Sequence, residues 1–311
     1  MQPPTPRPLP PPTLAALYPP IRGYRYFDAA EGWAFRPKAS VDEVQQAWWL
    51  AEHALLAYER SAKVASTLSS TGYRAQIARD RASSSFAYAA IGADHGVLAF
   101  RGTEALTPGD SWRKLASVAR DWWIDARVQR VPGAHGGHVH GGFQHALDAI
   151  WPQLQGVLDQ APLWWCCGHS LGGALAALAA ARLQDAGVPL AGAISFGQPR
   201  VGDAASAARL AQLPLLRVVN ACDVVPELPP EALGYQHAGQ LRHLDANRRE
   251  NYGRSVRSYW SRLPGNLRHG IGALTPIELI DHAPLHYVVK CYNAALQPES
   301  ADQRTICDDD G

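Results

Sequence analysis

Residues 163–173 read LWWCCGHSLGG, an apolar run that ends in a serine flanked by glycines. Residues 168–172, GHSLG, have the pattern G-x-S-x-G, in which a nucleophilic serine occupies a strained turn between a strand and a helix. Glycine at the flanking positions removes side chains that would collide there. Residues 171–184 are nearly all Ala and Leu, and Gly187 and Pro189 follow them, which predicts a helix and its end. The alternative interpretation is a plain glycine-rich turn.

The helix expected after the serine can stabilise a negatively charged reaction intermediate. Its amino end points at Ser170 and offers N–H groups without intrahelical partners, together with the positive end of the helix dipole. Both features stabilise an oxygen atom that gains negative charge during a reaction. The stretch therefore predicts nucleophilic chemistry at Ser170.

Length and composition allow one large α/β domain or two small ones, and we favour one domain with tails. The chain has 311 residues, of which 47% are hydrophobic, enough for a sizeable core. We expect the domain to span residues 23–298. Residues 1–22 are rich in proline and are expected to form an extended, mobile, disordered tail, with a ligand for a proline-recognising module as the alternative. Residues 299–311 are expected to form a polar C-terminal tail.

Charge and cysteine usage argue against several classes of partner. The formal net charge of +1 gives no bulk attraction to nucleic acid, and the 10 Trp residues are not interleaved with a basic run. We therefore expect no nucleic-acid partner, and the sequence does not identify a protein partner. Five Cys are present, and Cys166 and Cys167 are adjacent within an expected buried strand. This arrangement predicts core thiols rather than a disulfide framework.

The first 20 residues contain neither a basic segment nor an uninterrupted apolar segment of the kind that forms a secretory signal. No run of 18 apolar residues occurs in the sequence, so no membrane-spanning helix is expected. The expectation is a cytoplasmic protein by default, with non-classical export as the alternative.

Hydrophobic periodicity predicts strands that alternate with helices. Residues 41–58 carry apolar side chains at helical spacing, and residues 86–90 and 96–100 read as two strands joined by a tight turn. The apolar runs 191–196 and 215–219 each end in polar residues. Strands that alternate with helices imply a mostly parallel central sheet flanked by helices.

Candidate site residues follow the ends of these strands, where α/β sheets place ligand contacts. Thr103 follows the strand 96–100, and Asp223 follows the strand 215–219, on the same side of the sheet as Ser170. His282 and His286 are four residues apart, so helical spacing alone does not separate them. Pro284 suits the first turn of a helix, which places His282 in the preceding loop and His286 within the helix. We predict His282 as the base.

Three other segments have competing interpretations. His135, His138 and His140 lie within six positions, but their spacing matches no standard zinc arrangement, and we expect neither a metal nor a cofactor. Residues 106–119 read either as a mobile lid over the site or as a fixed amphipathic helix. Residues 234–274 are rich in Arg and His, which predicts an exposed, loop-rich, solvated basic segment, with transient contact to an anionic lipid surface as the alternative.

Six segments together resemble the class 3 lipases, a family of α/β-hydrolases that act on acylglycerols and related esters. They occur in the order found in the family, and the resemblance spans residues 48–296. The segments are 100–104 (FRGTE), 121–125 (DWWID), 139–143 (VHGGF), 168–173 (GHSLGG), 195–202 (SFGQPRVG) and 223–226 (DVVP).

The resemblance implies a role for each candidate residue. Ser170 would be the nucleophile and Asp223 the acid of a Ser-His-Asp triad. Thr103 and the N–H of Leu171 would form the oxyanion hole. His282 would be the base, since many family members have Asp-His-Ala or Asp-His-Ser followed by a Tyr five residues after the His, here Tyr287.

The implied activity is a lipase or esterase that hydrolyses acylglycerol-like lipids through an acyl-enzyme. A phospholipase or an acyltransferase would use the same triad, because the two alternatives differ only in the substrate or the acyl acceptor. A non-catalytic scaffold on a hydrolase fold is the alternative from a different class.

Overall fold

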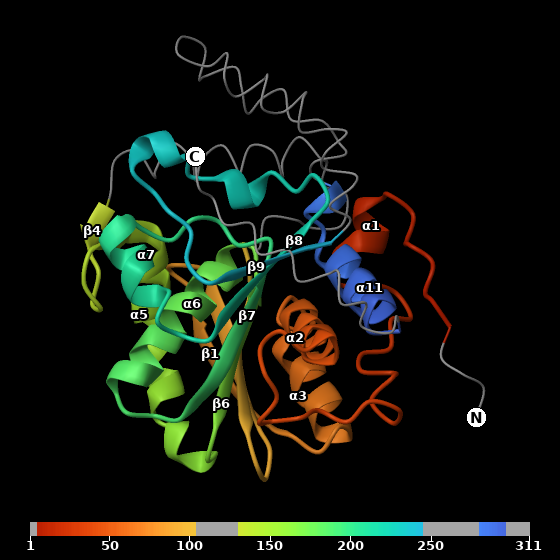
Figure 1. Cartoon of the computed structure of the whole chain (residues 1–311). Helices are drawn as coiled ribbons and strands as arrows, with labels where there is room; N and C mark the ends of the chain where they lie inside the picture. The colour runs from red at the N-terminus through yellow and green to blue at the C-terminus, as the bar shows by residue number, and fades with distance from the viewer. Residues whose placement is uncertain (1–4, 104–129, 245–279, 297–311) are drawn as a thin grey trace.

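A seven-stranded sheet organises the residues that the computed structural model describes, namely 5–103, 130–244 and 280–296 (Figure 1). The strand order is β1-β2-β3-β6-β7-β8-β9. The five strands from β3 to β9 in this order run parallel, whereas β1 pairs antiparallel with β2 and β2 pairs antiparallel with β3. The strands are β1 (Arg74–Asp80), β2 (Ser85–Ile91), β3 (Gly96–Phe100), β6 (Trp164–His169), β7 (Leu190–Phe196), β8 (Leu215–Asn220) and β9 (Gln240–Leu244).

Helices cover both faces of this sheet, as Figure 1 shows. One face carries α2 (Val44–Leu56), α3 (Ser61–Ser70) and α11 (Pro284–Ala295). The other carries α5 (Gly141–Gln155), α6 (Leu171–Asp185) and α7 (Ala204–Leu210). The shorter elements are α1 (Leu14–Leu17), a two-stranded sheet of β4 (Arg130–Pro132) and β5 (His138–His140), and 3₁₀ turns at Leu158–Gln160, Val225–Glu227 and Glu231–Leu233.

Strand β6 lies in the middle of the sheet, and its side chains contribute to both hydrophobic cores. Trp164 and Cys166 face the core beneath α5 and α6, whereas Trp165 and Cys167 face the core beneath α2 and α11. All four side chains are 0% exposed. A central parallel strand is covered on both faces, which explains why this segment is continuously apolar and not alternating. The prediction of core thiols at the two cysteines is confirmed.

The predicted mostly parallel sheet flanked by helices is confirmed. The sequence analysis did not identify α3 or the edge strand β1. It was wrong about residues 240–244, which form the edge strand β9 and not a loop. Most side chains of the edge strands β1 and β9 are exposed or half-buried, so these strands lack the apolar pattern that marks the central strands.

The proline-rich N-terminal segment contacts the domain, which differs from the mobile tail expected for it. The backbone N–H of Arg7 donates to the side chain of Asn293 at 2.7 Å, and its guanidinium lies 3.7 Å from the centre of the Tyr292 ring. Leu17 and Tyr18 are buried. Composition predicted an extended chain, but it carries no information about partners on α11, which lies nearly 290 residues away. The domain boundaries themselves stay a prediction.

Several expectations concern residues outside the described ranges. These are the lid or helix at 106–119, the segment 121–125, most of the Arg-rich stretch and the C-terminal tail. In the parts of the chain that are described, none of the helices has both the length and the apolar character needed to cross a bilayer.

Glu52 on α2 makes stability depend on pH. Its side chain is 0% exposed, accepts a hydrogen bond from the Tyr24 hydroxyl at 2.9 Å and lies 3.8 Å from the Arg7 guanidinium. Burial raises the pKa of Glu52 from 4.5 to about 8. The folded state therefore holds this proton more tightly than the unfolded chain does. The resulting stabilisation is present below pH 4.5 and is lost as the pH rises towards 8.

We expect Glu52→Gln to remove this dependence. The neutral amide resembles the protonated carboxyl, so the variant should match the parent protein near pH 4.5. At pH 8 its free energy of unfolding should exceed that of the parent by more than ~1 kcal/mol, since each pKa unit corresponds to about 1.4 kcal/mol. Urea unfolding at both pH values measures the difference. A variant less stable than the parent at pH 8 would contradict the raised pKa of Glu52.

Candidate active site

Ser170 occupies the sharp turn between β6 and α6. Its backbone has φ 59° and ψ −129°, a conformation that costs a non-glycine residue about 1–3 kcal/mol. A methyl group on Gly168 would lie 2.1 Å from the carbonyl oxygen of Gly172, so the flanking glycines allow strand and helix to touch. The Ser170 N–H donates to the carbonyl of Phe196 at 2.8 Å. These contacts hold the hydroxyl at the carboxyl edge of the sheet.

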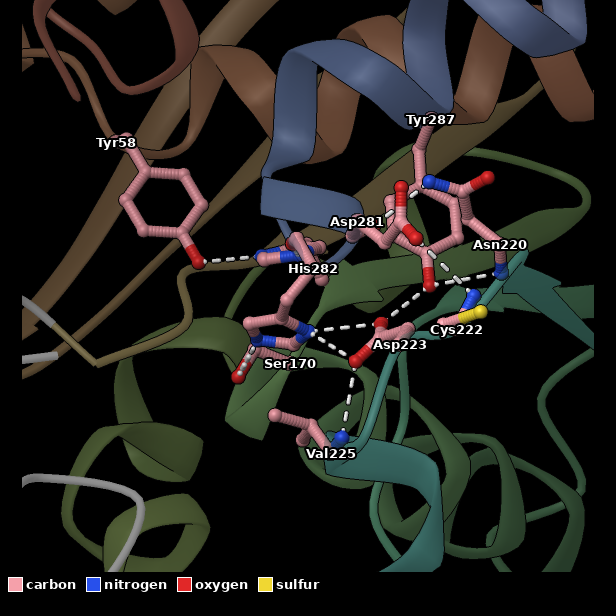
Figure 2. A network of polar contacts seen from close by, with 10 residues as sticks. Tyr58, Ser170, Asn220, Cys222, Asp223, Val225, Asp281, His282 and Tyr287 are labelled. Carbon is pink, nitrogen blue, oxygen red and sulfur yellow. Dashed lines mark hydrogen bonds and ion pairs between the residues drawn. The ribbon is translucent and has the colours of Figure 1, made fainter. Parts of the chain in front are cut away.

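His282 lies between Ser170 and Asp223, as Figure 2 shows. The His282 Nε2 atom is 2.9 Å from the Ser170 Oγ atom, and Nδ1 is 2.8 and 3.0 Å from the two Asp223 carboxylate oxygens. A carboxylate only accepts hydrogen bonds, so Nδ1 carries the proton and Nε2 is free to accept one from the serine hydroxyl. All three side chains are at most 5% exposed. The arrangement can remove a proton from Ser170 as its oxygen attacks a carbonyl carbon.

The Asp223 carboxylate has further donors. It follows β8, and its Oδ1 atom accepts the Val225 N–H at 2.9 Å, while Oδ2 accepts the Tyr287 hydroxyl at 2.5 Å. The Tyr287 hydroxyl in turn accepts the N–H of Asn220 at 3.1 Å. Burial, and then the nearby Asp223 charge, raises the pKa of Tyr287 well above its usual value, so this hydroxyl remains a donor. Two donors besides His282 therefore fix the orientation of the carboxylate.

Gly197 leaves the space in which these groups meet. Its φ of 59° lies in the left-handed region, and a methyl group there would lie 2.6 Å from Asp223 Oδ2 and 3.0 Å from His282 Nδ1. Sequence reasoning did not assign Gly197 to the site. It stands directly after β7, one strand away from Ser170, and its position within SFGQPRVG was the available signal.

Thr103 lies just beyond β3, where this strand meets the start of α6. Phe100 of β3 pairs with Gly168 of β6, and a methyl group on Gly172 would lie 2.1 Å from the Phe100 carbonyl oxygen. Within the described residues, the Thr103 hydroxyl is enclosed and has no hydrogen-bond partner. Leu171 is the first residue of α6, so its N–H lacks an intrahelical acceptor. Both predicted oxyanion donors thus belong to segments that converge beside Ser170.

The ring that contacts Ser170 and Asp223 belongs to His282, and His286 lies in the first turn of α11. Ala283 is the N-cap of α11 and Pro284 is its first residue. Because this proline starts the helix, His282, two residues earlier, stays in the loop, where its ring lies between Ser170 and Asp223. The structure brings together the three residues predicted for the triad.

The three histidines before α5 have separate contacts. His135 pairs with Asp185, His138 Nδ1 lies 3.1 Å from Asp203, and His140 Nδ1 accepts the Gly142 N–H at the start of α5. No group of three or more His, Cys, Asp or Glu side chains in the described residues is arranged to hold a metal ion.

The sequence profile of the family described as lipase (class 3) matches residues 97–233, the region that contains Thr103, Ser170 and Asp223. Residues 97–233 thus carry the sequence pattern of the class 3 lipase family. The match agrees with the mostly parallel sheet flanked by helices and with the order of the serine, the aspartate and the histidine along the chain.

Proteins similar to this chain include fungal lipases. A lipase of Rhizomucor miehei is 36% identical over 161 residues, 47% of this chain and 44% of the relative. The secreted mono- and diacylglycerol lipase A of Penicillium cyclopium is 35% identical over 150 residues, 45% of each chain. The structure of Rhizomucor miehei triacylglyceride lipase superposes with a TM-score of 0.53 at 27% identity, covering 67% of this chain and 83% of that one. The chain spans less than half the length of these curated relatives.

Proposed function

We propose that this protein hydrolyses carboxylic ester bonds of acylglycerol-like lipids through an acyl-enzyme on Ser170. The observation that carries the proposal is the buried line of contacts from the Ser170 hydroxyl through His282 to Asp223. A serine hydroxyl at neutral pH is a weak nucleophile unless a base accepts its proton, and the imidazole is placed to do so. The names of the fungal relatives support acylglycerols as the substrate class.

The reaction would proceed in two halves. Ser170 Oγ attacks the ester carbonyl while His282 Nε2 takes its proton, and the carbonyl oxygen becomes an oxyanion facing Thr103 and the Leu171 N–H. The tetrahedral intermediate collapses, the alcohol leaves with the proton from His282, and an ester of Ser170 remains. Water then repeats the sequence, with His282 accepting its proton, and releases the fatty acid and free Ser170.

A panel of esters tests this proposal and separates its alternatives. It contains soluble p-nitrophenyl esters of increasing chain length, mono-, di- and triacylglycerols, and phosphatidylcholine, each assayed with and without an added alcohol. We expect hydrolysis of the acylglycerols to exceed that of the phospholipid. Preferential release from phosphatidylcholine would favour a phospholipase, transfer to the alcohol would favour an acyltransferase, and no turnover of any ester would favour a scaffold.

Thr103→Val tests the oxyanion hole. Valine keeps the size of the side chain and removes the hydroxyl, so we expect kcat to fall ~10²-fold or more with little change in KM. Thr103→Ser keeps the hydroxyl and serves as the matched control. An effect confined to KM would mean that Thr103 only contacts the substrate and does not stabilise the transition state.

A further inference from the structure

Tyr58 and His169 lie beside the triad without contacting Ser170. Tyr58 follows α2, and its hydroxyl is 2.7 Å from His169 Nδ1. The opposite ring nitrogen, His169 Nε2, is 2.6 Å from the backbone carbonyl oxygen of His282. The His169 side chain is 1% exposed. A continuous line of hydrogen bonds therefore joins the segment after α2 to the backbone of His282.

The protonation state of this line follows from its acceptors. A carbonyl oxygen can only accept, so His169 Nε2 carries a proton and donates it to His282. Burial, and then the adjacent His282, lowers the pKa of His169 well below its usual value, so the ring stays neutral and Nδ1 accepts the Tyr58 O–H. Burial raises the pKa of the Tyr58 hydroxyl above its usual range, which keeps it protonated.

The same hydroxyl also contacts the segment that bears Thr103. The backbone of Gly102 lies against the Tyr58 oxygen. A methyl group on Gly102 would lie 2.0 Å from that oxygen and 2.8 Å from the His169 carbonyl. Tyr58 thus contacts both Gly102, the residue before Thr103, and His169, the residue before Ser170.

The carbonyl of His282 needs a donor from outside its own helix. Ala283 is the N-cap of α11, so the His282 carbonyl precedes the hydrogen-bond ladder of that helix, and Pro284 has no N–H to offer. His169 supplies the donor. The His169 and His282 rings also lie 4.5 Å apart between centroids, so the contact orients the loop at the point where the base projects.

We propose that Tyr58 and His169 are positioning residues that hold the His282 loop and the Gly102–Thr103 strand end in register with Ser170. This inference rests on the proposed hydrolase function. A displacement of about 1 Å between reacting groups lowers turnover by ~10²-fold, so loss of the line should lower kcat and leave substrate binding intact.

Three substitutions test the two ends of the line separately. His169→Gln places an amide N–H near the position of Nε2 and keeps a donor for His282. His169→Asn places its amide near Nδ1 and loses that donor. Tyr58→Phe removes only the hydroxyl and retains the ring, so it remains informative if a substitution at His169 prevents folding. The assay measures kcat and KM for p-nitrophenyl butyrate and the melting temperature of each variant, with Ser170→Ala as the reference for lost catalysis.

We expect kcat to fall ~10²-fold in His169→Asn and about tenfold in Tyr58→Phe, with KM within a few-fold of the parent. His169→Gln should recover activity to within about tenfold of the parent protein. Parent-like kcat in both His169→Asn and Tyr58→Phe would overturn the inference, as would equal losses in the Gln and Asn variants that follow melting temperature. Retained activity in Ser170→Ala would instead contradict the proposed function.

Discussion

Replacement of Ser170 by alanine is expected to abolish ester hydrolysis while the fold remains intact. Loss of the nucleophile in a serine hydrolase lowers kcat by ~10⁶-fold, because the histidine and aspartate have no covalent step left to assist. The change deletes one hydroxyl at the sheet edge and leaves the core volume unchanged, so the melting temperature should stay within a few degrees of the parent.

Ser195→Ala is the matched control for this experiment. Ser195 is a buried serine on the neighbouring strand β7, where its hydroxyl donates to the Leu216 carbonyl at 3.4 Å. The Ser195→Ala variant should retain ester hydrolysis. Hydrolysis that persists in a folded Ser170→Ala protein would contradict the assignment of the nucleophile.

The second large effect is expected at His282. His282→Ala removes the group that lies 2.9 Å from the serine oxygen, and kcat should fall ~10⁴-fold or more. His286→Ala is the internal comparison, since this residue lies four positions later in α11 and is also buried. It should change kcat by no more than a few-fold, although its burial makes some loss of stability expected.

Steady-state kinetics on a soluble ester, with melting temperatures for both proteins, separate the two histidines. A larger loss of kcat in His286→Ala than in His282→Ala would transfer the role of base to His286.

The sequence predicted those site residues whose positions depend on their immediate neighbours in the chain. The turn at Ser170 needs glycine on both sides, and the proline that starts α11 leaves His282 in the loop before it. Asp223 was found because a polar residue after a buried strand lies at the ligand-binding edge of a parallel sheet. Each of these inferences depends on residues that are a few positions apart.

Contacts between distant segments were not predictable in this way. Tyr58 and His169 are 111 residues apart, and nothing in the helical pattern of residues 41–58 indicated that the last tyrosine reaches the site. Arg7 contacts Asn293 across 286 residues, and the proline-rich composition around it describes only chain stiffness. Such pairs depend on how the layers pack, which a single sequence without an alignment does not encode in any local pattern.

We expect Ser170 to form the covalent intermediate. Diethyl p-nitrophenyl phosphate reacts with an activated serine oxygen, which displaces p-nitrophenolate and retains the diethyl phosphoryl group, and mass spectrometry then locates this group on a peptide. We predict one adduct, on the peptide that contains Ser170, absent in Ser170→Ala and formed far more slowly in His282→Ala. An adduct on another residue that accompanies loss of activity, or full hydrolysis with no adduct at Ser170, would contradict the account.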